Sequence, residues 1–385
     1  MKKPIFAMIP SAYKASTFYT PIPIDGEGDF TFTRSTVGTR MNKDGLIEEV
    51  AANVPRLDYL KDKNCPTLLL EGASTNLIIY SEDLSQSYWN EGGQIRTLSG
   101  VSPSGGLAYL VEKGTQGYMA TGSIVVTDGN TYTISAWLKS DNNSTVLIRF
   151  QELGGDFTSY FSKTITLTNE WVRYEVSGVK GVDGNPARFV FDSIQDGESF
   201  YAWGVQVEEN EVATSYIETT GVAVARGTDN CTNALSSTLY KGMEEQGSLY
   251  FSFYNIQDKL SFKGLSLSNS SNSNRVLLRQ NGKTDITAYI LNSTGTKALL
   301  SYIINPDKGF YKVCFIWEQD NCRLYVDGVL RSQDLTVDLT SSLPYTDFSY
   351  DGGSGSSDLL TGRHKELRLY NEVLTEAEAI ELTTI

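Results

Sequence analysis

Histidine is almost absent from this sequence, because His364 is the only one among its 385 residues. Any Ser-His-Asp or Cys-His catalytic arrangement would have to use this residue. It lies in Thr361–Lys365 (TGRHK), which we interpret as an exposed turn ahead of a strand. We therefore expect no catalytic histidine and no zinc site of the usual Cys/His type.

Cysteine is also scarce, and the four that occur are Cys65, Cys231, Cys314 and Cys322. Their spacing matches no zinc motif. Cys314 and Cys322 could share a hairpin, but a turn at Gln319–Asn321 would not place them opposite each other. We expect free, buried thiols.

Basic residues are outnumbered, with 32 Lys and Arg against 46 Asp and Glu and a formal net charge of −14. Nucleic acids and anionic membrane surfaces attract basic faces, so both are excluded as expected partners. No apolar run approaches the roughly 20 residues of a membrane helix. The apolar stretch between Pro4 and Pro10 is too short for a signal peptide, so we expect a protein made and kept in a cytosol, or released by lysis.

The sequence is rich in short alternating runs instead. In Thr131–Lys139, apolar residues occupy every second position, and Tyr311–Trp317 repeats the pattern in a second block that begins near residue 240. One-sided alternation is typical of sandwich sheets, which have one face in the core and one in water. Only the C-terminal end looks helical, since Thr375 and Glu378 fit a capping box.

These patterns predict an all-β protein with two antiparallel β-sandwich domains after an extended N-terminal arm. The proline-rich arm is expected to order by docking onto a partner. The predicted segments are an arm at 1–25, an adaptor at 26–80, a first sandwich at 81–226, a linker at 227–240 and a second sandwich at 241–385.

Three stretches resemble known families. In residues 30–90, TR…DG…AAN.PR.DY precedes LLLE…TNL…SED…W, which resembles a segment common in bacteriophage tail-fibre and head-fibre proteins. Residues 131–226, with YTISAWLKSDN and AWGVQVEE…ATSYIETTG…AR, resemble the carbohydrate-binding-module-like jelly roll that follows it in such proteins. Residues 245–385, with YVDG and a closing ELRLYNEVLTEAEAIEL, resemble laminin-G-like, concanavalin-A-like domains.

The resemblance implies a virion fibre or decoration protein, with a capsid head fibre favoured over a tail fibre. It implies a homotrimer that attaches to capsid or tail proteins through its N-terminal arm and binds host surface glycans, and it places the protein in the virion. The alternatives are a tailspike-like glycosidase, testable by new reducing ends on host polysaccharide, and a cellular lectin or adhesin, testable from neighbouring genes.

We predict no enzyme activity. Concanavalin-A-like glycosidases carry acidic residues at alternating positions, and Glu318-Gln-Asp320 begins such a pattern, but Cys322 and Arg323 occupy its third acidic position. We predict no cofactor. Laminin-G-like domains often hold one Ca²⁺, to which Asp258, Asp347 and Asp351 could contribute from loops, but no acidic spacing here is diagnostic, so no metal ligand is named.

A sugar site needs an aromatic plate beside planar polar groups. Trp137 lies on the polar face of its strand, and Arg149, Gln151 and Gln206 lie on outward faces of other strands, so neighbouring strands would make them one patch. On this hypothesis, Trp137→Ala abolishes glycan binding by the 81–226 fragment. The competing interpretation is that this face packs on another subunit or on the upstream segment. Trp203 and Trp317 are expected in the core.

Overall fold

The computed structural model describes residues 1–60, 64–89, 92–192, 194–254, 262–281, 284–305, 308–353 and 359–385. The chain forms two compact units. Unit 1 consists of Met1–Ser35, Val50–Gly72 and Thr228–Ile385, and unit 2 consists of Thr36–Glu49 and Ala73–Gly227. The chain therefore crosses between the units at four points, and this division differs from the predicted one.

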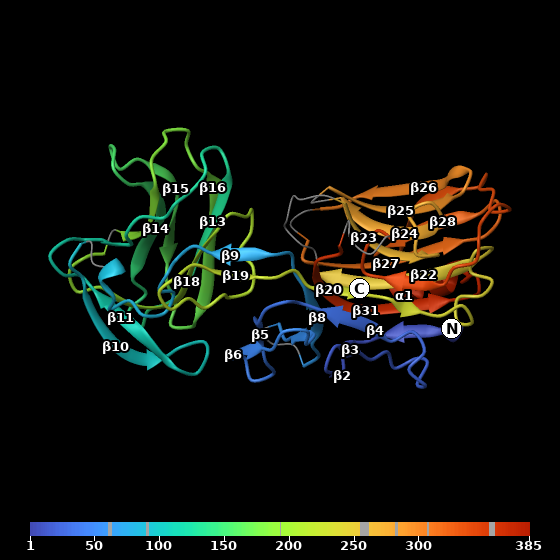
Figure 1. Ribbon diagram of the computed structural model, residues 1–385, viewed down its shortest axis with the longest axis horizontal. Helices are drawn as coiled ribbons and strands as arrows, with labels where there is room; N and C mark the ends of the chain where they lie inside the picture. Colours follow the sequence, from blue (N-terminus) through green and yellow to red (C-terminus); the bar gives the residue numbers. More distant parts are fainter. Residues whose placement is uncertain are drawn as a thin grey trace. The chain divides into compact units, whose positions relative to one another are not determined.

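The described strands of unit 1 form two main sheets around one core, and most of these strands are labelled in Figure 1. The first contains, in order, β29 (Val329–Asp334), β28 (Cys322–Val326), β27 (Phe310–Trp317), β22 (Gly247–Tyr254), β31 (Gly362–Tyr370), β8 (Thr67–Leu70) and β7 (Arg56–Asp58), with β1 (Phe6–Met8) also paired to β31. The second contains β21 (Ala234–Leu235), β30 (Asp347–Ser349), β23 (Phe262–Ser268), β24 (Arg275–Asn281), β25 (Asp285–Asn292) and β26 (Gly295–Ile303). A small sheet joins β2 (Tyr13–Lys14), β3 (Thr17–Phe18), β4 (Phe30–Thr33) and β20 (Asn230–Thr232).

Both faces of β27 are buried, which explains its hydrophobicity. Its odd-numbered residues, Tyr311 to Trp317, lie in the sandwich core. Cys314 and Ile316 face the other way and pack with Ala379 and Leu382 of helix α1 (Glu376–Thr383). The predicted capping box of α1 is confirmed, since Thr375 and Glu378 cap each other reciprocally.

The described strands of unit 2 form a sandwich of two sheets. One contains β10 (Ile95–Val101), β11 (Leu107–Glu112), β18 (Ser199–Glu208), β13 (Thr131–Lys139) and β16 (Val172–Val179). The other contains β12 (Met119–Ala120), β17 (Ala187–Asp192), β14 (Thr145–Glu152) and β15 (Ser159–Thr166). Two pairs accompany them, β5 (Gly38–Met41) with β6 (Ile47–Val50) and β9 (Ser74–Asn76) with β19 (Val224–Arg226), and Ser87–Trp89 form a 3-10 turn.

The alternating residues of β13 meet the core as predicted. Tyr132, Ile134, Ala136 and Leu138 are at most 1% exposed and pack against the inward residues of β14 and β17. The prediction of an all-β protein with two antiparallel sandwiches is confirmed.

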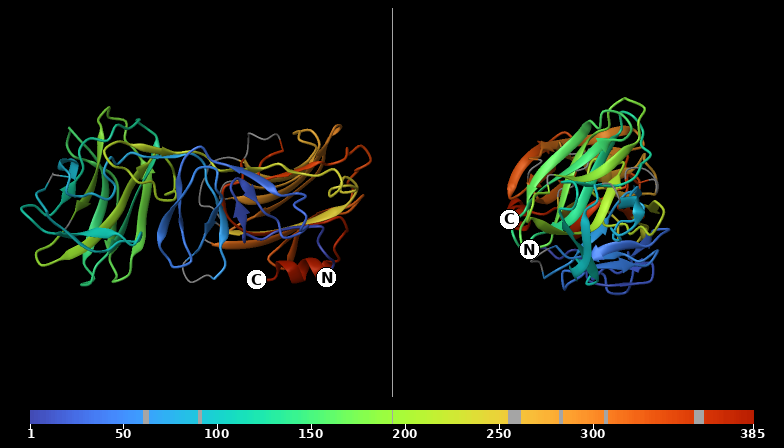
Figure 2. Two further views of the ribbon diagram at one scale, coloured as in Figure 1. Left: turned by 60° about the horizontal axis from the view of Figure 1, so that its bottom comes forward. Right: turned by 90° about the vertical axis from the view of Figure 1, so that its left-hand side faces the viewer.

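The N-terminal segment 1–25 is part of unit 1 and does not form a separate arm. Strand β1 pairs with β31, and Phe6, Met8 and Phe18 are fully buried in the unit 1 core. The Lys2 amide donates to Glu378, which places the N-terminus beside α1 (Figure 2). The expectation of an arm ordered by a partner is therefore wrong for these residues.

The predicted adaptor and linker are also distributed differently. Within residues 26–80, β4, β7 and β8 belong to unit 1, whereas the β5–β6 turn and β9 belong to unit 2. Within 227–240, β20 and β21 join two sheets of unit 1, and Tyr240 lies in its core. Both segments are too short to bury their apolar residues locally, so they complete sheets whose other strands lie far away in the sequence.

Candidate functional site

The four predicted sugar-binding residues lie on two different sheets of unit 2. Trp137 on β13 and Gln206 on β18 share the outer face of the five-stranded sheet, where β13 and β18 are paired. Arg149 and Gln151 lie on β14 in the opposite sheet, with their side chains away from the core residues Ile148 and Phe150. The prediction of a single patch is therefore wrong.

The outer face around Trp137 is covered by the chain itself. Trp137 and Ile47 are partly buried and pack against the cluster that contains Trp203 and Tyr216, whose rings lie 4.5 Å apart. Gln206 is fully buried, and its Oε1 accepts from the Ile217 amide at 2.9 Å. The contact with Ile47, which belongs to β6, supports the interpretation that this face packs on an upstream segment. Trp203 is buried in this outer cluster and not in the main sandwich core, which corrects the expectation for it.

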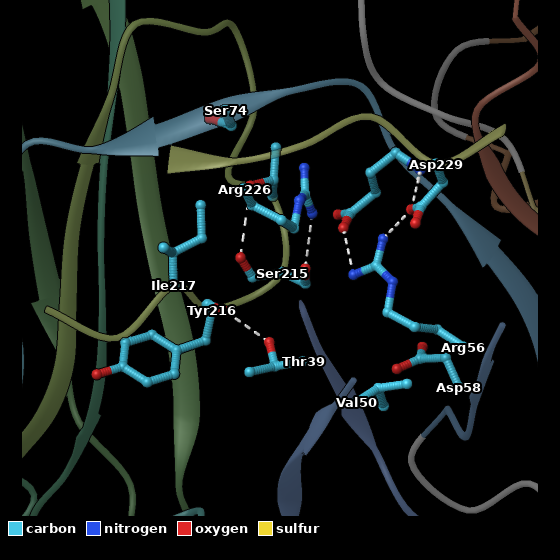
Figure 3. A network of polar contacts seen from close by, with 12 residues as sticks. Thr39, Val50, Arg56, Asp58, Ser74, Ser215, Tyr216, Ile217, Arg226 and Asp229 are labelled. Carbon is cyan, nitrogen blue, oxygen red and sulfur yellow. Dashed lines mark hydrogen bonds and ion pairs between the residues drawn. The ribbon is translucent and has the colours of Figure 1, made fainter. Parts of the chain in front are cut away.

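The motif ATSYIETTG…AR is the segment that covers this face. Glu208 accepts from the Ser74 hydroxyl at 2.6 Å and from the Thr214 amide at 3.0 Å. The hydroxyl of Thr39 donates to the Tyr216 carbonyl at 2.6 Å, and Arg226 donates to Ser215, as Figure 3 shows. This motif therefore has a structural role, because its residues cover the outer face of the five-stranded sheet of unit 2.

The motif TR…AAN.PR.DY…LLLE also has a structural role, in unit 1. Arg34 and Arg56 are buried, and both donate to the fully buried carboxylate of Asp229, the Arg56 contact being drawn in Figure 3. Arg56 also pairs with Glu71 at 2.8 Å. Burial acts to lower the pKa of Arg56, but the charges of Glu71 and Asp229 outweigh it and raise that pKa.

Opposite the covered face lies a second outer surface, which we call the β14–β17 face. It consists of Tyr118, Arg149, Gln151, Phe157, Arg188 and Asp192. The strand register places Arg149 across from Val190 and Gln151 across from Arg188, so all these strand residues point away from the core. Phe157 comes from the loop between β14 and β15.

Arg188 is the centre of the β14–β17 face. Its guanidinium lies 4.7 Å from the Phe157 ring centroid and 5.8 Å from that of Tyr118. Its Nε donates to Gln151 Oε1 at 2.9 Å, and Gln151 Nε2 donates to the Phe157 carbonyl at 2.6 Å. Arg188 and Gln151 are buried, so they hold the loop and orient the aromatic rings.

Phe157 combines an exposed ring with an unusual backbone conformation. Its ring is 48% exposed, and its φ is 55°, a left-handed conformation that is unusual for a bulky residue. Strained backbone is found more often at binding sites than elsewhere. The loop thus exposes the apolar ring of Phe157 to solvent, next to the polar side chains of Gln151 and Arg188.

The β14–β17 face carries two positive side chains, Arg149 and Arg188, and one negative side chain, Asp192. Arg149 pairs with Asp192, and their side chains are 24% and 21% exposed. Partial burial lowers the pKa of Arg149, and the nearby charge of Arg188 lowers it further. The two guanidinium groups are therefore close enough to repel each other.

Sequence reasoning missed Tyr118, Phe157 and Arg188. Arg188 carried a usable signal, because Phe189 and Phe191 point into the core and strict alternation then turns Arg188 outward. Tyr118 and Phe157 lie outside regular strands, so no periodicity could assign them to this face.

His364 does not lie in an exposed turn. It is part of β31, is 1% exposed, and stacks on Tyr350 at 5.1 Å and packs against Phe251. The expected turn at Gln319–Asn321 is confirmed, with Glu318 and Asp320 at the β27–β28 hairpin.

The four cysteines are free, and Cys314 lies opposite Tyr325, not opposite Cys322. Cys231, Cys314 and Cys322 are buried as expected, whereas Cys65 is exposed, contrary to the expectation of a buried thiol.

Of the three aspartates considered for calcium, Asp258 lies outside the described residues. Asp347 lies in strand β30, not in a loop, and Asp351 lies just beyond it; both are buried. Among the residues that the structure describes, no group of three or more His, Cys, Asp and Glu side chains could hold a metal ion. In the same part of the chain, no helix is long and apolar enough to cross a membrane.

Burial raises the pKa of Asp347, and the charge of Asp351 adds to this effect. Because the pKa is higher in the folded state, the ionised carboxylate disfavours folding at pH values above it. Asp347→Asn should therefore raise the unfolding temperature of unit 1 at pH 7. The gain should vanish below about pH 4, where aspartate is protonated in both states.

Trp317 reports on this change, because it is the only tryptophan of unit 1 among five in the chain. Protein labelled with 5-fluorotryptophan would show its loss of structure as one resolved ¹⁹F signal. A lower unfolding temperature for Asp347→Asn at pH 7 would contradict the argument.

Comparisons with known proteins agree with this fold. Residues 78–197 match the family described as a carbohydrate binding domain, and residues 255–379 match the concanavalin A-like lectin/glucanases superfamily. The chain thus carries a carbohydrate-binding-module-like jelly roll and a laminin-G-like, concanavalin-A-like sandwich. No curated protein matches the chain.

Among solved structures, a family 40 carbohydrate-binding module of a Ruminococcus gnavus sialidase, bound to α2,3-sialyllactose, is 14% identical. The match covers 40% of this chain and 92% of that one, with a TM-score of 0.34. A xylan-binding module from Paenibacillus barcinonensis is 12% identical over 36% of this chain and 94% of its own, with a TM-score of 0.27.

Proposed function

We propose that this protein binds glycans through the β14–β17 face of unit 2. The observation that carries the proposal is the stacking of the Arg188 guanidinium with the rings of Phe157 and Tyr118, next to the amide of Gln151. An exposed ring next to planar hydrogen-bonding groups is the arrangement that a sugar needs, since its C–H face stacks and its hydroxyls pair. The family match of residues 78–197 supports the same function.

The residues of the face would divide the work. Phe157 and Tyr118 would contact the C–H faces of sugar rings. Arg149 and Asp192, both partly exposed, would bond with sugar hydroxyls at the edge of the face. Gln151 and Arg188 are buried and would act as positioning residues.

We propose binding without catalysis. Glycoside hydrolysis uses two carboxyl groups that flank the scissile bond. Of the strand residues that the register places on this face, Asp192 is the acidic one, and Arg149 holds its carboxylate.

Affinity electrophoresis of the full chain tests this function. Migration through gels that contain xylan, laminarin, alginate or polygalacturonate should be retarded by at least one polymer. No new reducing ends should appear after prolonged incubation with that polymer. Free migration in every gel would refute glycan binding, and reducing ends would refute a purely binding role.

Trp137→Ala is the matched control for the site. It should lower the free energy of unfolding of unit 2 by about 2–4 kcal/mol, because a large half-buried ring leaves the cluster with Trp203 and Tyr216. Glycan affinity should stay within about twofold of that of the unmodified chain, since the ring lies on the other sheet. A selective loss of binding in a folded variant would restore the predicted Trp137 site.

We also propose that the protein is a fibre or decoration protein of a bacteriophage particle, as a homotrimer on the capsid. The support is the resemblance of residues 30–90 to segments of such proteins. Attachment through a free N-terminal arm is no longer part of the proposal, because residues 1–25 are folded into unit 1. Immunogold labelling of purified particles and native mass spectrometry test it, and unlabelled particles or a stable monomer would refute it.

A further inference from the structure

We infer that the β14–β17 face selects glycans that carry an anionic substituent, a carboxylate or a sulfate. The inference rests on the proposed function and specifies its ligand class. The register places three charged strand residues on this face, and two of them are arginines. Together with Asp192 they leave one excess positive charge, in a chain whose formal net charge is −14.

The two arginines are placed at an electrostatic cost. They come from neighbouring strands and lie two positions apart in the register, which makes them diagonal neighbours on one face. The charge of Arg188 lowers the pKa of Arg149, so the two guanidinium groups interact unfavourably. A neutral sugar would leave this repulsion in place, whereas an anion between them would relieve it.

Arg149 is the group that a ligand can reach. Its side chain is 24% exposed, whereas Arg188 is buried, and its contact with Asp192 is made through one terminal nitrogen. Its Nε is buried, so an incoming anion would meet the terminal nitrogens of the guanidinium. A guanidinium offers parallel N–H groups to two oxygens of one anionic group, which neutral hydroxyls match poorly.

The aromatic rings next to the arginines set the geometry of the ligand. Phe157 lies over Arg188, so a sugar ring that stacks on Phe157 is held close to the arginine pair. An anionic group on that sugar can therefore reach Arg149 without leaving the stack. The face thus fits an acidic sugar within a chain better than a free inorganic anion.

Matched polymers test this inference on the full chain. Polygalacturonate is compared with its carboxyl-reduced form, and dextran sulfate with dextran, by isothermal titration calorimetry. For at least one pair we expect the anionic polymer to bind about tenfold more tightly or better. The pair that shows the difference identifies carboxylate or sulfate as the substituent.

Three variants locate the effect. Arg149→Gln should lower the affinity for the anionic polymer to about that for its neutral partner, so that the preference for the anionic polymer is lost. Arg149→Lys should be intermediate, because it keeps the charge but loses the parallel N–H groups. Arg40→Gln is the control, since it removes one positive charge from unit 2 at the β5–β6 pair, where Arg40 bonds with Glu48.

The outcomes separate this inference from the proposed function. Equal affinity for both members of each pair, with loss of both in Phe157→Ala, would overturn the anionic preference and leave glycan binding intact. An anionic preference that Arg149→Gln preserves would also overturn it. If no polymer binds, or if Phe157→Ala leaves binding unchanged, the inference and the proposed function both fail.

Discussion

Asp229→Asn is expected to destabilise unit 1 by about 3–5 kcal/mol, because it leaves two buried arginines without a full counter-charge. Arg34 and Arg56 are both buried, and both donate to this carboxylate. Asparagine keeps the shape of the side chain, so the loss would come from charge and from one acceptor. Glu71, which is 15% exposed, would still pair with Arg56 and sets the lower end of this range.

Urea unfolding followed through the ¹⁹F signal of labelled Trp317 measures this loss in unit 1 alone. The control is Asp320→Asn, a change of the same kind in an exposed turn with a φ of 57°, which asparagine tolerates well. The control should lie within about 0.5 kcal/mol of the unmodified chain. A similarly small effect for Asp229→Asn would mean that the motif around Arg34 and Arg56 is not a structural clamp.

Phe157→Ala should weaken glycan binding at least about tenfold, since an exposed stacking ring is worth about 1.4 kcal/mol or more. Stability should change little, because the ring is 48% exposed. Isothermal titration calorimetry with the polymer found by affinity electrophoresis measures the change.

Phe157→Tyr is the conservative control and should keep most of the affinity, because its ring also stacks. If Phe157→Ala binds as well as the unmodified chain, the β14–β17 face is not the glycan site.

The secondary structure was largely predictable because its signals are local. Alternation in Thr131–Lys139 and Tyr311–Trp317 depends only on one buried and one outer face per strand, and Thr375 with Glu378 caps a helix within four residues. The division into units was not predictable in this way. Strand β1 finds its partner β31 more than 350 residues away, so nothing near Phe6 indicates that it is buried.

The site shows the same limit. Alternation correctly predicted that Trp137, Arg149, Gln151 and Gln206 point away from the main core. It does not show which strands are neighbours. Pairing of β13 with β18, and of β14 with β17, separates the four residues between two sheets. The outer face around Trp137 is covered by Ile47, from a segment before the sandwich strands, and by Tyr216, from a segment after them. Alternation within a strand carries no information on such distant segments.

Hydrogen–deuterium exchange of the full chain, with and without a bound oligosaccharide, tests the central claim most directly. We expect slower exchange of amides in β14, β17 and the loop that carries Phe157, with no change in β13 and β18. Protection confined to β13 and β18, or to unit 1, would contradict the account.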